Sequence, residues 1–209
     1  MEKNSFENNF QQCRIASPVD GRVILASNSP RRRELLAMIV PQFEVEALMG
    51  VDESYPAELP AAEVPEYLSR LKSGAYPGEL AEGDLLITAD TVVIVDGEIL
   101  GKPHDRDEAV EMLKRLSGRT HLVVSGVCVR GAKSAKSFSS QTEVTFARLD
   151  DRQIEKYVDE YRPFDKAGAY GIQEWIGAVA IESIKGSFYN VMGLPVHALY
   201  RVLADGGFS

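Results

Sequence analysis

Residues 22–36 read RVILASNSPRRRELL, an apolar run that passes directly into a segment rich in hydroxyls and arginines. The opening RVILA is short and apolar, as buried strands are. A helix should follow it, because Ser29 suits the N-cap and Pro30 suits the first helical position. Apolar residues then recur at helical spacing until Pro41. The stretch therefore predicts a strand, a loop and a helix in immediate succession.

The start of this predicted helix carries an unusual charge pattern. Arg31, Arg32 and Arg33 fall in its first turn, where positive charge opposes the helix dipole. An anion bound at the helix N-terminus would remove that conflict. The hydroxyls of Ser27 and Ser29, free backbone amides and guanidinium groups together suit a polyphosphate. The alternative is an N-cap serine followed by solvated arginines, and the segment alone favours neither. It is not a Walker A loop, so no GTPase or kinase mechanism is predicted.

The rest of the chain mixes predicted strands with predicted helices. Strands are expected at 85–95, 98–100, 121–130, 142–149 and 178–184, and helices at 65–75, 107–116, 150–161 and 195–203. Asp96-Gly97 between two apolar runs predicts a hairpin. The Ser/Lys-rich segment 131–141 is interpreted as a surface loop between paired strands. We therefore expect an α/β or α+β fold with a mixed sheet.

Composition places the chain among ordinary globular proteins. Of its 209 residues, 44% are hydrophobic and 26% are charged, and no linker separates independent domains. Residues 1–20 are interpreted as a polar N-terminal extension and 21–209 as a single domain. Cys13 and Cys128 form neither a disulfide framework nor a metal motif, and two reduced thiols are expected. The histidines His104, His121 and His197 lack metal-ligand spacing, and a structural role is expected for His121.

The charge balance bears on partners and location. A net charge of −8 argues against non-specific binding to nucleic acid or anionic membranes. No apolar run approaches the roughly 20 residues that cross a bilayer. The first twenty residues lack the apolar stretch of a signal peptide. A cytoplasmic protein is expected, and an anionic ligand would need a local cluster of basic residues.

Asp90 stands with Thr91 inside the nearly continuous apolar run 85–95. Aspartate is depleted in strands, and a buried carboxylate is costly unless it is paired or bound to a metal. At a strand end facing a cleft, it would hold a divalent cation or orient an attacking water. The pattern fits equally well an aspartate in a turn or bulge that bonds to local backbone.

Scattered acids and bases complete the candidate chemistry. They are Asp52-Glu53, Lys72, Lys102-Pro103 and Asp165-Lys166. Each one taken singly is typical of a solvated surface residue. Triphosphate hydrolysis needs such a set: cations for the phosphates, carboxylates for Mg²⁺ and one group that positions water.

Eight pieces in order, spanning about residues 23–204, make the chain resemble the Maf-like family of nucleoside triphosphate pyrophosphatases. They are LASNSPRRRELL (25–36), Lys72, TADTVV (88–93), GEILGKP (97–103), AVEMLKRLSGRTHLVVSGV (109–127), TEVTF (142–146), DKAGAYGIQ (165–173) and GSFYNVMGLPV (186–196). The resemblance implies a mixed, curved central sheet with flanking helices and two lobes around a cleft, similar to inosine triphosphatase. It also favours a functional role over the local alternatives for Arg31, Arg32 and Asp90.

The resemblance also implies a reaction. Such enzymes split the α–β phosphoanhydride of a nucleoside triphosphate with Mg²⁺ or Mn²⁺, releasing a monophosphate and pyrophosphate. Asp90 matches the catalytic proton acceptor, and Glu53 matches a supporting acid that shares the metal with it. The residues that match phosphate contacts are Ser27, Arg31, Arg32, Lys72 and Lys102.

Arg31, Thr91 and Gln173 match the positions that track substrate choice, and their combination is similar to the branch acting on dTTP and UTP, extending to modified pyrimidine triphosphates. A sister branch acts on 7-methyl-GTP. The chain departs from the pattern at Glu174-Trp175-Ile176-Gly177, where the family often has a shorter, glycine-bearing link. This difference from the family pattern affects the part of the pocket wall that is expected to lie next to the base.

The alternative function is a nucleotide-sensing regulator of cell division, since the family is linked to arrest of septum formation. Such a sensor would bind nucleotide without significant turnover, and it would not need Asp90. Nucleic-acid binding ranks third because the chain is acidic and lacks a basic stripe. The resemblance also implies a homodimer.

Overall fold

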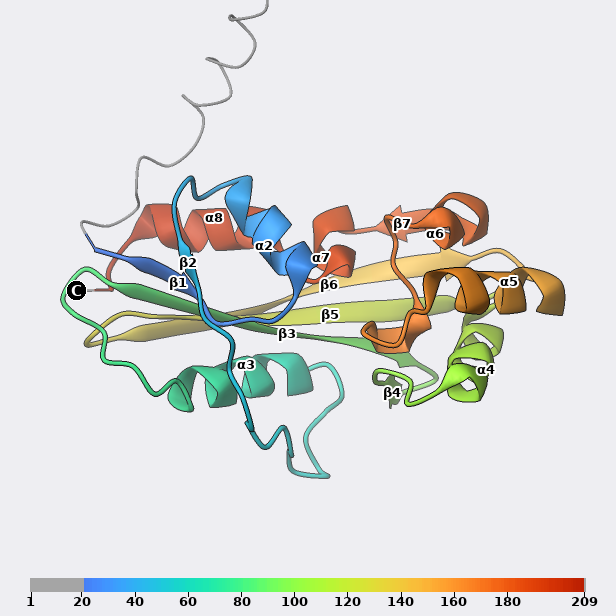
Figure 1. Ribbon diagram of the computed structural model, residues 1–209, viewed down its shortest axis with the longest axis horizontal. Coiled ribbons are helices and arrows are strands. Elements are labelled where there is room, and N and C mark those ends of the chain that lie inside the picture. Colours follow the sequence, from blue (N-terminus) through green and yellow to red (C-terminus); the bar gives the residue numbers. More distant parts are fainter. Residues whose placement is uncertain (1–20, 209) are drawn as a thin grey trace, which may run out of the picture.

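A computed structural model describes residues 21–208, so the predicted extension 1–20, with Cys13, lies outside the described residues (Figure 1). Its centre is a seven-stranded sheet in the order β2-β1-β3-β5-β6-β7, with β4 paired to β3. The strands are β1 (Val23–Leu25), β2 (Glu44–Val45), β3 (Leu85–Val95), β4 (Glu98–Leu100), β5 (Thr120–Arg130), β6 (Ala135–Phe146) and β7 (Ile181–Lys185). β1 is parallel to β2 and β3, and the other pairs are antiparallel. The predicted mixed α/β fold is confirmed.

Helices cover both faces of this sheet. They are α2 (Pro30–Ala37), α3 (Val64–Gly74), α4 (Arg106–Leu116), α5 (Asp151–Tyr161), α6 (Trp175–Ala180), α7 (Phe188–Met192) and α8 (Val196–Asp205), with a 3₁₀ turn at Ala167–Ala169. In Figure 1, α2, α7 and α8 lie on one face, α3 lies on the other, and α4 and α5 gather at one end of the sheet. One apolar core lies between α2, α8 and the sheet, and a second one surrounds α4 and α5. No helix within residues 21–208 is long and apolar enough to span a membrane.

Several local predictions are confirmed by backbone geometry. The Ser29 side chain caps α2 by accepting the Arg32 N–H at 3.4 Å. Asp96 and Gly97 both have positive φ, 53° and 81°, as a tight two-residue hairpin requires. The N-cap Asp150 of α5 makes a capping box with Gln153. Residues within a few positions of one another therefore determine where these helices begin and where the hairpin turns.

One predicted segment is wrong, and another begins too early. Residues 131–141 are not a loop: β6 begins at Ala135, and only a tight turn, closed by Gly131 N–H donating to Ser134 O at 2.8 Å, separates it from β5. Much of the first half of β6 is solvent-accessible, so its sequence lacks a buried apolar alternation. The strand predicted at 178–184 is present as β7, but it begins three residues later than predicted, at Ile181. Ile176 and Ala180, four residues apart and fully buried, belong to α6, and β7 starts only after them.

Besides α6, two short elements were not predicted, β2 and α7. β2 has two residues and α7 has five, so neither is long enough to show a periodicity in the sequence. Both nevertheless matter for the cleft described below. The loop that follows β2 and the C-terminal end of α7 contribute to its walls.

Candidate active site

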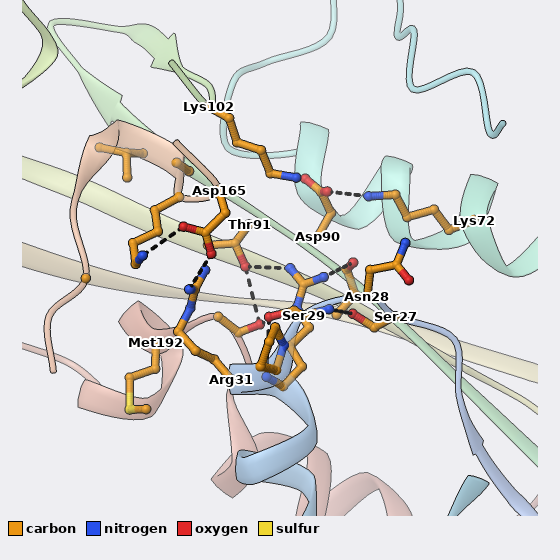
Figure 2. A pocket seen from close by; sticks show the side chains of 18 of the residues that line it. Ser27, Asn28, Ser29, Arg31, Lys72, Asp90, Thr91, Lys102, Asp165 and Met192 are labelled. Carbon is orange, nitrogen blue, oxygen red and sulfur yellow. Dashed lines mark hydrogen bonds and ion pairs between the residues drawn. The ribbon is translucent and has the colours of Figure 1, made fainter. Parts of the chain in front are cut away.

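A cleft of about 410 Å³ opens where the start of α2, the loop after β2 and the loop before α6 meet the middle of β3. Figure 2 shows its polar side chains. All nine site residues expected from the sequence line this one cleft: Ser27, Arg31, Arg32, Glu53, Lys72, Asp90, Thr91, Lys102 and Gln173. They are distributed over 147 positions of the chain, since the first is residue 27 and the last is residue 173. The structure therefore brings together the whole predicted set.

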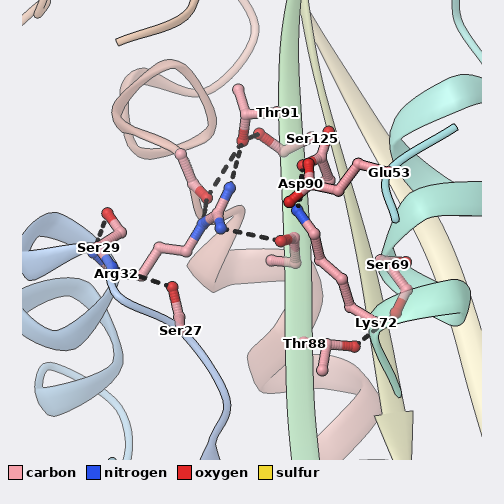
Figure 3. A network of polar contacts seen from close by, with 12 residues as sticks. Ser27, Ser29, Arg32, Glu53, Ser69, Lys72, Thr88, Asp90, Thr91 and Ser125 are labelled. Atoms are coloured by element: carbon pink, nitrogen blue, oxygen red, sulfur yellow. Dashed lines mark hydrogen bonds and ion pairs between the residues drawn. The ribbon is translucent and has the colours of Figure 1, made fainter. Parts of the chain in front are cut away.

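The strand β3 separates two sets of polar side chains, as Figure 3 shows. Successive side chains of a strand point to opposite faces. Thr88 and Asp90 face α3, where the Thr88 hydroxyl donates to Ser69 O at 2.7 Å. Ala89 and Thr91 lie toward α2 on the other face. Asp90 is therefore in mid-strand, so it is neither a turn or bulge residue nor at a strand end, but it does face a cleft as expected.

An ion-pair cluster surrounds Asp90. Lys72 Nζ lies 2.6 Å from Asp90 Oδ1 and 3.1 Å from Glu53 Oε2. The side chains of Lys72 and Asp90 are only 14% and 12% exposed, so water screens their attraction weakly. Lys102 points toward the same carboxylate in Figure 2. Two acids and two lysines therefore gather at one point of the cleft.

A glycine allows α3 to bring Lys72 to this point. Gly126 on β5 pairs with Asp90 on β3. A Cβ at Gly126 would lie 2.2 Å from backbone atoms of Pro65 and Glu66, at the start of α3. Only glycine accommodates a helix packed this closely on the sheet. Lys72 lies two helical turns beyond Pro65, which places it over Asp90.

Arg32 links three elements on the opposite face of β3 (Figure 3). Its Nε donates to Gly193 O at 2.8 Å, one Nη to Ala89 O at 2.8 Å and the other Nη to Thr91 Oγ1 at 3.1 Å. Burial lowers the pKa of this guanidinium, and the nearby charge of Asp90 opposes that effect. Because a guanidinium has five N–H donors, two remain for a ligand. Arg32 thus joins α2 to β3 and to the link between α7 and α8.

Arg31 has a different environment from its neighbour. Its Nη1 donates to Asp165 Oδ2 at 2.8 Å, and the other oxygen of Asp165 accepts from Lys166 Nζ at 2.8 Å. Burial raises the pKa of Asp165, but the hydrogen bonds from Lys166 and Arg31 outweigh it, so the pKa lies below the ordinary value. Arg31 therefore reaches across the cleft, from the start of α2 to the loop before α6.

The cleft also has an apolar wall, which includes Met192 on the side away from Lys72 in Figure 2. This wall also includes Val93, Val123, Ala167, Tyr170 and Val191. The hydroxyl of Tyr170 lies 2.8 Å from His121 Nε2, and both rings pack on Phe146. Burial lowers the pKa of His121 to about 4, so this histidine is neutral near pH 7 and has the structural role that was expected. One end of the cleft suits phosphates, and the other suits a flat, apolar ring.

Sequence reasoning missed a buried hydroxyl and amide chain behind Thr91. Thr91 Oγ1 lies 2.8 Å from Ser125 Oγ, which donates to Asn190 O at 3.0 Å. The amide of Asn190 donates to Val123 O at 3.1 Å and to Thr142 Oγ1 at 3.0 Å. These residues come from β3, β5, β6 and α7, so no spacing in the sequence could have revealed the chain.

The acids of the cleft fit a divalent cation held together with substrate. Across residues 21–208, no cluster of three or more His, Cys, Asp or Glu side chains is placed to hold a metal alone. Glu53 and Asp90 nevertheless converge on one ammonium group. Mg²⁺ is usually bound by one or two carboxylates plus substrate phosphates. The donor set therefore suits a cation that arrives with a triphosphate.

Comparison with known proteins identifies the family of the chain. The family model described as Maf-like protein matches residues 22–206. The chain belongs to the Maf-like family. This Maf-like protein is 56% identical over 190 residues to the dTTP/UTP pyrophosphatase of Porphyromonas gingivalis, covering 90% of this chain and 96% of that one. With the dTTP/UTP pyrophosphatase of Bacteroides thetaiotaomicron, identity is 54% over 182 residues, covering 87% and 94%. Among solved structures, the Staphylococcus aureus Ham1 protein gives a TM-score of 0.44 at 16% identity, covering 61% of this chain and 72% of that one.

Proposed function

We propose that this Maf-like protein hydrolyses dTTP and UTP, and modified pyrimidine triphosphates, to the nucleoside monophosphate and pyrophosphate. The observation that carries the proposal is that one cleft holds Asp90 within a cationic end, beside Lys72, and also has an apolar end that suits a base. In a bound nucleotide, the α-phosphate joins the nucleoside to the other two phosphates. It therefore lies where those two ends meet. The names of relatives 54–56% identical over most of the chain support the same substrates.

The start of α2 and the lysines bind the phosphates. Free N–H groups at the start of a helix attract anions, and the Ser27 and Ser29 hydroxyls keep their own donors. Arg31 gains a stronger partner when a triphosphate enters, since three phosphates carry more charge than Asp165 alone. Lys102 is held beside the loop before α6, because Gly101 O accepts the Gly168 N–H at 3.0 Å.

Asp90 accepts the proton of the attacking water. The water oxygen bonds to the α-phosphorus, and the bond from that phosphorus to the oxygen bridging to the β-phosphate breaks. Pyrophosphate leaves with that oxygen. The ion pair with Lys72 holds the Asp90 carboxylate in place at 2.6 Å. A positioned general base of this kind contributes roughly 10²–10⁴-fold to a rate.

Glu53 and Asp90 would hold a divalent cation, Mg²⁺ or Mn²⁺, together with the substrate. The cation supplies positive charge that offsets the charge developing on pyrophosphate. Because two protein carboxylates form a weak metal site, we expect tight metal binding only when nucleotide is present. Calorimetry with Mn²⁺ in the presence and absence of a non-hydrolysable nucleotide measures this dependence.

A nucleotide panel tests the proposed function. The protein is incubated with Mg²⁺ and each ribo- and deoxyribonucleoside triphosphate, and pyrophosphate and inorganic phosphate are assayed separately. We expect pyrophosphate from dTTP and UTP at the highest kcat/KM. Release of single phosphates, or no product from any nucleotide, would sink the proposal.

The proposal also covers the domain organisation, the location and the oligomeric state of the protein. We propose that residues 21–209 act as one unit in a cytoplasmic homodimer. Light scattering measures the mass directly, and a single species at the mass of one chain would contradict the dimer.

A further inference from the structure

The turn that carries Gln173 is attached at both ends to one phenol. Glu174 N–H donates to Gly171 O at 3.0 Å, which closes a four-residue turn. Tyr157 OH donates to the Glu174 carboxylate and accepts the Gly171 N–H at 3.0 Å. Ile172 is buried in the core, at 5% exposure. Gln173 is thus the residue of this turn whose side chain is exposed, and it lines the cleft.

Glu174 also connects this turn to the phosphate end. Its Oε1 lies 3.1 Å from Lys166 Nζ, and Lys166 is itself bonded to Asp165, the partner of Arg31. Lys166 is 8% exposed, so its contact with Glu174 is well shielded from water. A Cβ at Gly171 would lie 2.8 Å from the Glu174 carboxyl carbon, so the carboxylate packs directly against the turn.

The phenol of Tyr157 stays protonated and able to donate. Tyr157 is fully buried. Burial, together with the hydrogen bond to Glu174, raises its pKa far above the ordinary value. The hydroxyl therefore satisfies a carboxylate and a backbone N–H at once. Glu174 and Tyr157 form what we call the turn clamp.

A glutamine needs such a clamp in order to distinguish pyrimidines. Its amide carries one acceptor and one donor group, and a half-turn exchanges them. Uracil and thymine present an N3–H donor beside the O4 acceptor, whereas cytosine presents an N3 acceptor beside an amino donor. A glutamine on a mobile turn matches either edge. A glutamine on a fixed turn has fewer side-chain orientations in which its amide reaches the base.

We propose that Glu174, through the turn clamp, is a positioning residue that makes Gln173 selective for uracil or thymine over cytosine. This inference rests on the proposed function, because it places a pyrimidine at the apolar end of the cleft.

Equilibrium binding tests the inference without turnover. Dissociation constants are measured by calorimetry for the α,β-imido analogues of dUTP and dCTP, on the wild type, Glu174→Gln, Gln173→Ala and the double variant. We expect each single variant to reduce the dCTP-to-dUTP ratio of Kd about tenfold, as loss of a discriminating hydrogen bond does. The double variant should show no further loss, because both changes remove the same interaction. Glu160→Gln is the matched control, since Glu160 lies on the surface of α5 and pairs with Lys156.

Three results with the variants overturn the inference. Glu174→Gln retains the wild-type ratio, or it weakens both analogues equally as a general structural defect would, or the two changes add in the double variant. If Glu174→Gln does not fold, as judged by its thermal transition, Tyr157→Phe breaks the same clamp and should give the same tenfold change. A wild type that does not prefer the dUTP analogue also overturns it. Failure of the proposed function is a separate result, seen as no pyrophosphate from wild-type protein and dTTP.

Discussion

The two ends of the cleft are built in different ways. The phosphate end is largely local: Ser27, Ser29 and Arg31 lie within five consecutive residues at the start of one helix. The base end takes its walls from segments far apart in the chain, among them Val93, Val123 and Met192, and from the turn that carries Gln173. Charged side chains attract phosphates over a distance, so they need only approximate placement. Selection of a base needs a pocket wall of defined shape. Changes at the phosphate end should therefore affect all nucleotides alike, and changes at the base end should alter preference.

The largest effect is expected at Asp90, in the phosphate end of the cleft. Asp90→Asn keeps the size of the side chain but removes the proton acceptor, so kcat should fall about 10³-fold. In metal-free buffer, binding of a non-hydrolysable dTTP analogue should remain, because Asp90 contacts the cation and not the phosphates. Initial rates of pyrophosphate release and calorimetry measure the two effects. Asp159→Asn, at an exposed pair with Arg106, is the control. Normal turnover by Asp90→Asn would show that the base is misassigned.

The base end should give the protein an acid-sensitive stability. His121 has a pKa of about 4 in the folded protein and 6.5 as its ordinary value, so the unfolded chain binds the extra proton between these pH values. Stability is therefore full above pH 6.5 and falls as the pH drops toward 4, by up to about 3 kcal/mol from this group. Urea unfolding of the wild type and His121→Gln between pH 4 and 7 measures the difference. Parallel curves for the two proteins would rule out His121 as the source.

At the phosphate end, substitution of Arg32 should lower the stability of the fold, whereas substitution of its neighbour Arg31 should weaken substrate binding. Arg32→Met leaves Ala89 O and Gly193 O without their donor, so the free energy of unfolding should fall by about 2 kcal/mol. Urea denaturation at pH 7.5 measures it, with Arg33→Met as the control at an exposed position of the same helix. An unchanged midpoint for Arg32→Met would mean that the guanidinium does not support the structure.

The smallest effect is expected for Arg31→Met, which removes the ion pair with Asp165 across the cleft. Loss of one charge-assisted phosphate contact should raise KM about tenfold with little change in stability. If the contact is to phosphate, KM should rise equally for dTTP, UTP and dCTP. A rise in KM for only one of these nucleotides would show that Arg31 contacts the base and not a phosphate.

The same contrast explains what the sequence could predict. The start of α2 and the hairpin at Asp96-Gly97 follow from capping and turn chemistry within a few residues, and both were predicted. Asp90 was singled out because a carboxylate is unusual inside an apolar strand. Its partner Lys72 lies 18 positions earlier, and the family resemblance alone connected the two.

Base-end features escaped prediction because they depend on tertiary packing. The turn clamp joins Tyr157 and Glu174, and the amide of Asn190 joins β5 to β6, with no local pattern in either case. The interpretation of residues 131–141 as a loop failed for a related reason. β6 is held by pairing with β5 from Arg130↔Ala135 to Thr120↔Thr145, and that pairing does not require an apolar outer face.

The central claim is that Asp90 directs water at the α-phosphorus of a nucleotide that lies along both ends of the cleft. Hydrolysis of dTTP in ¹⁸O-labelled water, followed by mass spectrometry of the products, tests it most directly. We expect one ¹⁸O atom in thymidine monophosphate and none in pyrophosphate. Label in pyrophosphate, or in released single phosphate, would contradict it.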